Sequence, residues 1–248
     1  MVAKKAAKKD VVVKDDQVPD YIRTDAQRGS ENVTQRDLLV PRLTILQALS
    51  PEVDEDGAAY VPGARPGYLV NTLTKQMWSG KDGVLVVPVV FDKQHMVWRE
   101  REEGGGLLGV YDTAEEAQAR LAMEGGEAAN VEYVETPQHI CFVLNDDGSP
   151  IEEIAIPMPK SKYKISRRWN SLIRINGGDR FSRAYRIRSV KDKGPKGEFY
   201  NFEITNAGWA SKDAYEAAED LYEAIMSGRL KVQAAADEER SASDRPAF

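Results

Sequence analysis

Residues 160–200 read KSKYKISRRWNSLIRINGGDRFSRAYRIRSVKDKGPKGEFY, and we expect the rest of the chain to be organised around this stretch. It holds thirteen lysines and arginines against three carboxylates, a formal charge of +10, whereas the whole 248-residue chain carries −6. Six aromatic rings are interleaved with these charges. Cations follow a phosphate backbone and flat rings stack on unpaired bases, so the combination is typical of proteins that bind single-stranded nucleic acid. The alternative is that the rings belong to the core and the cations form a solvated surface.

The first half of this stretch predicts a helix over residues 161–175. Ile165, Trp169, Leu172 and Ile173 recur at the spacing of one helical face, and most lysines and arginines fall outside that face. We therefore expect Trp169 to pack in the core rather than to stack on a ligand.

The second half predicts a β-hairpin, formed by residues 181–190 and 198–204 around a basic turn. Neither face of the first strand is cleanly apolar, so this strand would bring arginines and rings together at a surface. The residues expected to contact nucleic acid are Lys160, Lys162, Lys164, Arg167, Arg168, Arg174, Arg183, Tyr185, Arg186, Arg188, Lys191, Lys193, Lys196 and Tyr200. Trp78 and Trp98 are expected in the core, with stacking on a base as the alternative.

Most of the remaining chain reads as β-strands. The continuous apolar, β-branched run at 84–91 is the strongest indication of a buried strand. The apolar segment at 38–50 contains Pro41, which indicates an edge strand or the first residue of a strand. Further strands are expected at 67–73, 95–101, 131–135, 139–144 and 151–157, and further helices at 113–124 and 211–226. The fold class is therefore mainly β (α+β).

Composition bounds the chemistry. There is no GxxxxGK[ST] or GxGxxG motif, and two histidines with one cysteine do not supply an ordinary zinc site. Cys141 lies in an apolar run and is expected to be buried. We expect no cofactor, no metal and no enzymatic activity, although a Ser–His or Cys–His nucleophile pair stays open. No segment has the length of a membrane span or the pattern of a secretory signal, which favours the cytoplasm.

A β-rich core, a helix that leads into a basic hairpin, and a polar tail that ends in Phe248 together resemble tailed-phage single-stranded DNA-binding proteins. The segments 39–53 and 67–74 are also similar to proteins of phage replication modules. The resemblance implies an OB-like barrel, here with an inserted helix, a helix before the basic hairpin and a C-terminal helix.

The same resemblance implies a function. The protein would bind single-stranded DNA without sequence preference during phage DNA replication or recombination, in the host cytoplasm, by a basic groove with aromatic stacking. Its tail, through Asp244, Pro246 and Phe248, would recruit a polymerase, a primase–helicase or a nuclease. Whether it forms a homo-oligomer is left open.

Four regions are expected on this basis: a flexible basic N-terminal arm (1–20), an OB-like DNA-binding core (21–208), a C-terminal helix (209–230) and a flexible tail (231–248). The first 17 residues contain five lysines and few large apolar groups, so burial cannot offset the entropy of ordering them.

Three other functions fit the same residues. A single-strand annealing protein would differ in oligomer size and strand-pairing activity. A non-catalytic virion or DNA-associated structural protein would bind single and double strands alike. A metal-dependent nuclease would cleave DNA in the presence of Mg²⁺.

Overall fold

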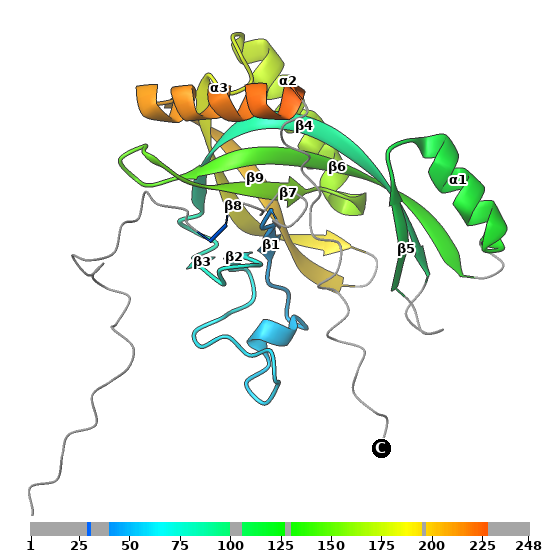
Figure 1. The fold of residues 1–248 in the computed structure, drawn as a ribbon. Coiled ribbons are helices and arrows are strands. Elements are labelled where there is room, and N and C mark those ends of the chain that lie inside the picture. The colour runs from blue at the N-terminus through cyan, green and yellow to red at the C-terminus, as the bar shows by residue number, and fades with distance from the viewer. Residues whose placement is uncertain (1–28, 31–39, 100–105, 127–129, 195–196, 228–248) are drawn as a thin grey trace, which may run out of the picture. The chain divides into compact units, whose positions relative to one another are not determined.

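The computed structural model describes residues 29–30, 40–99, 106–126, 130–194 and 197–227. The chain divides into two units, Met1–Leu38 and Leu39–Phe248, and all the elements below belong to the second unit. Its described part contains nine β-strands and three α-helices, which confirms the expectation of a mainly β, α+β fold (Figure 1).

A six-stranded antiparallel sheet forms the centre of this unit (Figure 1). Its strands are β4 (Val84–Arg99), β5 (Gly106–Tyr111), β6 (Val131–Leu144), β7 (Pro150–Pro157), β8 (Arg183–Gly194) and β9 (Gly197–Trp209). The strand order is β7-β6-β4-β8-β9, and β5 pairs with the far end of β4. Because β8 returns beside β4 after a helical connection, the order β8-β4-β6-β7 is that of a Greek key.

Two helices, α2 (Tyr163–Asn176) and α3 (Lys212–Met226), pack on opposite faces of this sheet. Successive residues of a strand point to opposite faces. Val86 accordingly packs in the cluster that contains Trp169 of α2, whereas Val87 packs in the cluster that contains Leu221 of α3. The C-terminal helix is therefore part of the same compact unit as the sheet.

The expected helices are confirmed by their caps and faces. The hydroxyl of Thr113 accepts a hydrogen bond from the Glu116 N–H at the start of α1 (Ala114–Met123), and Ser211 caps α3 in the same way. Trp169 is completely buried on the inner face of α2, as the periodicity predicts.

Two expected strand pairs merge into long single strands. Residues 84–91 and the described part of the second expected strand, 95–99, form one strand, β4. Residues 131–135 and 139–144 form another, β6, which runs through Pro137. The Pro137 carbonyl accepts from the Met158 N–H at 2.7 Å, so the missing N–H lies on the side where pairing with β7 ends. Proline is tolerated in a strand at such a position.

The prediction of an OB-like barrel needs a correction, because the sheet does not close. Its path through the described residues ends at β7 on one side and β9 on the other. The strand expected over 38–50 is only three residues long, β1 (Leu43–Ile45), and it pairs with β2 (Leu69–Asn71) in a small separate sheet completed by β3 (Met77–Trp78).

The segment around β1 lies between the two free edges of the large sheet. On one side the Ala155 N–H of β7 donates to the Pro41 carbonyl at 2.8 Å, and Arg42 bridges Ala155 in parallel. On the other side the Gln47 side chain binds the backbone of Tyr200 on β9. A short segment thus meets both edges, and so β7 and β9 do not pair with each other.

Several expectations lie outside the described residues. These are the N-terminal arm (1–20), the tail (231–248) with Asp244, Pro246 and Phe248, and the residue Lys196 in the hairpin turn. Among the helices that the structure describes, none is long and apolar enough to cross a membrane.

Candidate nucleic-acid interface

Helix α2 presents two chemically different faces. Ser166, Trp169 and Ile173 are buried against the sheet. The opposite face carries four exposed cations, spaced three, four and seven residues apart, which we call the basic stripe: Lys164, Arg167, Arg168 and Arg174. The helix contains no carboxylate, so its outward face is uniformly positive over about 15 Å from the first to the last of these residues.

Most of the charge of the basic stripe is unpaired. Lys164 lies 3.6 Å from Asp192 of β8, but Arg167, Arg168 and Arg174 join none of the ion pairs formed by described residues. Like charges three and four residues apart on a helix repel one another. An anion that lies along the stripe would therefore relieve repulsion within the protein as well as gain attraction.

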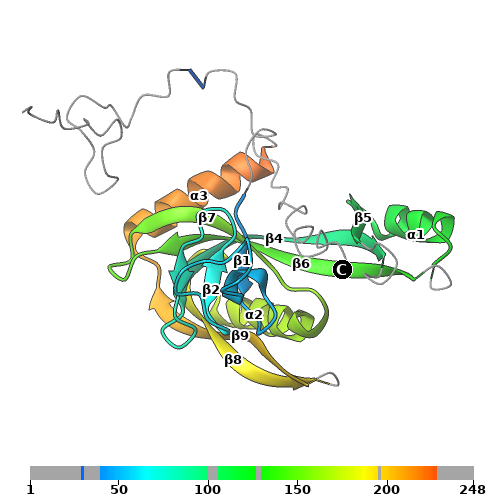
Figure 2. The same ribbon diagram turned by 90° about the horizontal axis from the view of Figure 1, so that it is seen from below.

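Helix α2 lies between two branches of the sheet, as Figure 2 shows. β4 and β8 pair only through Val84–Val86 and Tyr185–Ile187. Beyond that point β4 continues with β6, and β8 continues with β9 as a separate hairpin. The helix contacts both branches: Tyr163 donates a hydrogen bond to Glu135 of β6 at 3.0 Å, and Lys164 faces Asp192 of β8.

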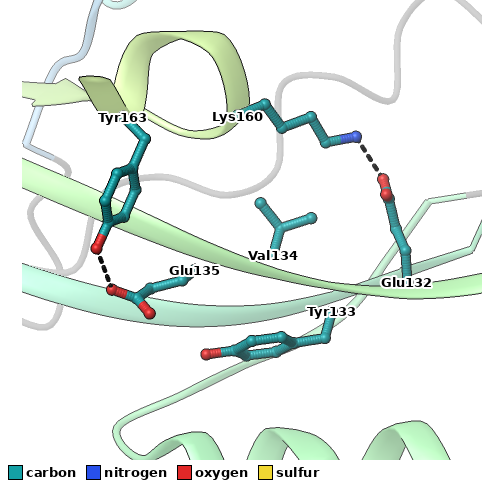
Figure 3. A pocket seen from close by; sticks show the side chains of 6 residues that line it. All are labelled: Glu132, Tyr133, Val134, Glu135, Lys160 and Tyr163. Carbon is teal, nitrogen blue, oxygen red and sulfur yellow. Dashed lines mark hydrogen bonds and ion pairs between the residues drawn. The ribbon is translucent and has the colours of Figure 1, made fainter. Parts of the chain in front are cut away.

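A pocket lies where the start of α2 approaches β6 (Figure 3). Lys160 forms an ion pair there with Glu132. A hydrogen bond from the Lys93 ammonium, and another from the Tyr163 hydroxyl, lower the pKa of Glu135 below its ordinary value. The cations at this pocket are thus already neutralised, and Lys160 differs in this respect from the arginines of the basic stripe.

The remaining predicted basic residues do not form one continuous patch. Arg186 points toward Asp146, at 3.6 Å, and donates to the Asp82 carbonyl at 3.3 Å, at the end of β8 away from the hairpin turn. Lys191 lies 3.7 Å from Glu198 within the hairpin. Other members of the set lie in three places: Lys162 over the Phe202 ring, Arg188 half-buried beside Gly83, and Lys193 exposed near the turn.

The two predicted tyrosines are less accessible than a stacking role requires. Tyr185 is 1% exposed, its ring packs edge-on against Trp169 at 5.7 Å, and its hydroxyl accepts from Asn176. The expectation that Tyr185 stacks on a base is therefore wrong, because its face of β8 lies under α2. Tyr200 is half-buried and packs on Gly67, where an added Cβ would come within 2.6 Å of the ring.

The two tryptophans considered for stacking, Trp78 and Trp98, are also partly buried. Trp78 packs against the core cluster of the sheet, and Trp98 is half-buried on β4. Trp209, which the sequence pattern does not single out, is 68% exposed at the end of β9. The guanidinium carbon of Arg183 lies 3.7 Å from the centre of its ring. The sequence feature that could have indicated an exposed ring is the position of this tryptophan directly after Gly208, at the polar end of a hairpin strand.

A family model described as Pam3 phage gp34-like protein matches residues 7–231. The chain belongs to this family. The match places the chain among phage proteins, and its description states no ligand and no activity. No curated protein and no solved structure matches the chain.

In this gp34-like chain a buried histidine lies beside a serine, which bears on the open question of a nucleophile pair. His139 Nε2 lies 2.8 Å from Ser166 Oγ, and its Nδ1 lies 2.6 Å from a guanidinium nitrogen of Arg180. A guanidinium can only donate, so Nδ1 is the acceptor and Nε2 carries the proton that it donates to Ser166. A general base must instead accept the proton of the serine hydroxyl. In this pair the histidine donates to the serine, so it cannot act as that base.

The surroundings of this pair also oppose catalysis. Burial, and then the charge of Arg180, lower the pKa of His139 well below its ordinary value. Burial raises the pKa of the Cys141 thiol, which keeps it protonated. The histidine ring stacks on Trp169 at 4.4 Å, so the cluster is a hydrogen-bonded part of the core. Within the described ranges, no three His, Cys, Asp or Glu residues gather to hold a metal ion.

Proposed function

We propose that this phage protein binds single-stranded DNA without sequence preference, with the phosphates along the basic stripe of α2. The observation that carries the proposal is the set of three arginines, Arg167, Arg168 and Arg174, without a carboxylate partner among the described residues. They lie on a helix free of acidic residues in a chain whose formal charge is −6. Positive charge concentrated in this way favours a polyanion.

The position of α2 favours a single strand over a duplex. A helix that reads a duplex inserts into a major groove about 12 Å wide. The branches formed by β6 and by β8–β9 flank α2 (Figure 2), and we infer that they hinder insertion of the helix into such a groove. A single strand can instead lie along the exposed face of the helix between the two branches.

The strand order supports an OB-type relationship. OB-folds are partly open Greek-key barrels of five strands that commonly bind oligonucleotides. Here β8-β4-β6-β7 is the spatial order of the Greek key. Helix α2 connects β7 to β8 along the chain, and β9 extends the sheet beside β8. We propose an OB-type fold in which residues 41–47 lie between the edge strands β7 and β9. In this fold the connection between β4 and β6 carries β5 and α1 as an insertion. A role in phage DNA replication or recombination, with partners recruited by the tail, is part of the same proposal.

The test is a titration of labelled single-stranded and double-stranded DNA of equal length at two salt concentrations. We expect single strands to bind about tenfold or more tightly, with a log–log salt slope of about −0.7 for each phosphate neutralised. The triple variant Arg167→Gln, Arg168→Gln, Arg174→Gln should make this slope shallower by about 2.

A matched triple variant controls for the general loss of positive charge. Arg65→Gln, Lys75→Gln and Lys81→Gln remove three exposed cations outside the interface and should leave the slope unchanged. Equal affinity for single and double strands would favour a virion or DNA-associated structural protein instead. Absence of binding at low salt would contradict any nucleic-acid function for α2. Strand pairing of complementary oligomers would assign the annealing function.

A further inference from the structure

Trp209 and Arg183 form a stacked pair at the surface. The indole is 68% exposed, and one of its faces is covered by the Arg183 guanidinium at 3.7 Å. The two residues are cross-strand partners in the β8–β9 hairpin, so their side chains lie on the same face of the sheet. Because the residue is 68% exposed, most of the indole surface that Arg183 does not cover is open to solvent.

This pair lies on the α2 side of the sheet. Arg183, Tyr185 and Ile187 alternate along β8 and share one face, because the extra residue at the register shift, Ala207, lies on β9. Tyr185 and Ile187 pack in the core cluster under α2. The Tyr185 hydroxyl binds Asn176, the last residue of the helix. Arg174, the last residue of the basic stripe, is two residues before the end of the helix at Asn176. The stacked pair therefore lies beyond the C-terminal end of α2.

The charge of Arg183 is available to a ligand. It joins none of the ion pairs that the described residues form. Its Nε is buried, so only the terminal nitrogens of the guanidinium are candidates for contact with a ligand. The pair thus offers a flat ring beside a cation that has no carboxylate partner among the described residues.

We propose that Trp209 and Arg183 form a base-stacking platform, on which an unpaired base stacks against the open indole face while Arg183 contacts a neighbouring phosphate. The proposal rests on the proposed function and extends it, because the basic stripe supplies only sequence-blind contacts to phosphate. Aromatic rings add affinity for any base, since every base has a flat face. The platform would therefore distinguish a strand that carries bases from a bare chain of phosphates.

The experiment compares two ligands on the full chain: labelled oligo-dT, and an abasic deoxyribose-phosphate oligomer of the same length. Trp209→Ala should weaken binding of oligo-dT about tenfold, and should leave binding of the abasic oligomer unchanged. Trp209→Phe should retain most of the affinity, because a ring remains. Arg167→Gln should weaken both ligands equally, because its contact is to phosphate.

Leu49→Ala is the matched control, since Leu49 is an apolar side chain 96% exposed in the turn after β1. It should change neither affinity. A second readout is indole fluorescence: oligo-dT should quench the wild-type emission, and Trp209→Phe should lose the quenching.

The outcomes separate this inference from the proposed function. If the wild type binds both oligomers and Trp209→Ala binds oligo-dT equally well, the platform is wrong while the basic stripe stands. An equal loss on oligo-dT and on the abasic oligomer would also overturn stacking. If the wild type binds neither oligomer at low salt, the proposed function and the platform both fail.

Discussion

The side-chain amide of Gln47 binds both backbone groups of Tyr200. Its Nε2 donates to the Tyr200 carbonyl at 3.0 Å, and its Oε1 accepts from the Tyr200 N–H at 2.8 Å. A primary amide presents one donor and one acceptor side by side, as a neighbouring strand would. Gln47 thus satisfies an edge of β9 that would otherwise expose unpaired groups, and it fixes the segment that lies between β7 and β9.

Gln47→Ala should therefore destabilise the protein by about 1–3 kcal/mol, because it removes two hydrogen bonds and leaves the partly buried Tyr200 groups unsatisfied. Urea denaturation measures the loss in free energy of unfolding. Hydrogen exchange at the Tyr200 amide should accelerate as well. Gln76→Ala, at an exposed glutamine in the β2–β3 turn, is the control and should be neutral. Equal stability of the two variants would show that the contact of Gln47 with β9 contributes nothing measurable to stability.

Tyr185 should affect stability rather than affinity for DNA. Tyr185→Ala creates a cavity beside Trp169 and should cost about 3–5 kcal/mol. Tyr185→Phe keeps the ring and loses only the hydrogen bond from Asn176, so it should cost about 1 kcal/mol. Thermal or urea unfolding gives these values. Tyr185→Phe should bind oligo-dT as the wild type does, and a clear loss of affinity would restore a direct role for the hydroxyl.

The helices could be predicted because their signals are local. The spacing of Ile165, Trp169 and Ile173 places α2 and its buried face, and the residues off that face become the basic stripe. The pairing of β4 with β8 could not be predicted, because it joins Val86 to Tyr185 across a large part of the chain. The same holds for the role of residues 41–47 at the two sheet edges.

The errors in the site have one physical origin. Alternation along a strand shows which residues share a face but not which face is buried. Arg183 lies on the same face of β8 as Tyr185 and Ile187. Its charge favours the prediction that this face is exposed, but Tyr185 and Ile187 are part of the core. Trp209 was missed because β9 continues past the expected end at residue 204, and its register with Arg183 depends on the bulge at Ala207.

Ser211 should stabilise the docking of α3. Its hydroxyl accepts from the Ala214 N–H at 3.2 Å, which caps the helix, and donates to the Gly148 carbonyl at 2.7 Å. Ser211→Ala should lower the free energy of unfolding by about 1–2 kcal/mol. Ser161→Ala, at an exposed serine just before α2, should have little effect. If both variants unfold at the same urea concentration, the cap contributes nothing measurable.

The buried His139 should make stability depend on pH below its ordinary pKa of 6.5. Its pKa in the folded protein is lowered, so between that value and 6.5 the unfolded chain binds a proton that the folded chain does not. The stability that His139 contributes is therefore present above pH 6.5 and is lost as the pH falls, by up to about 1.4 kcal/mol per pH unit. Urea denaturation between pH 6.5 and the onset of carboxylate protonation measures this slope. His139→Gln should remove the slope, whereas His95→Gln, which changes the other histidine of the chain, should keep it. A slope that persists in His139→Gln would assign the pH dependence to other groups.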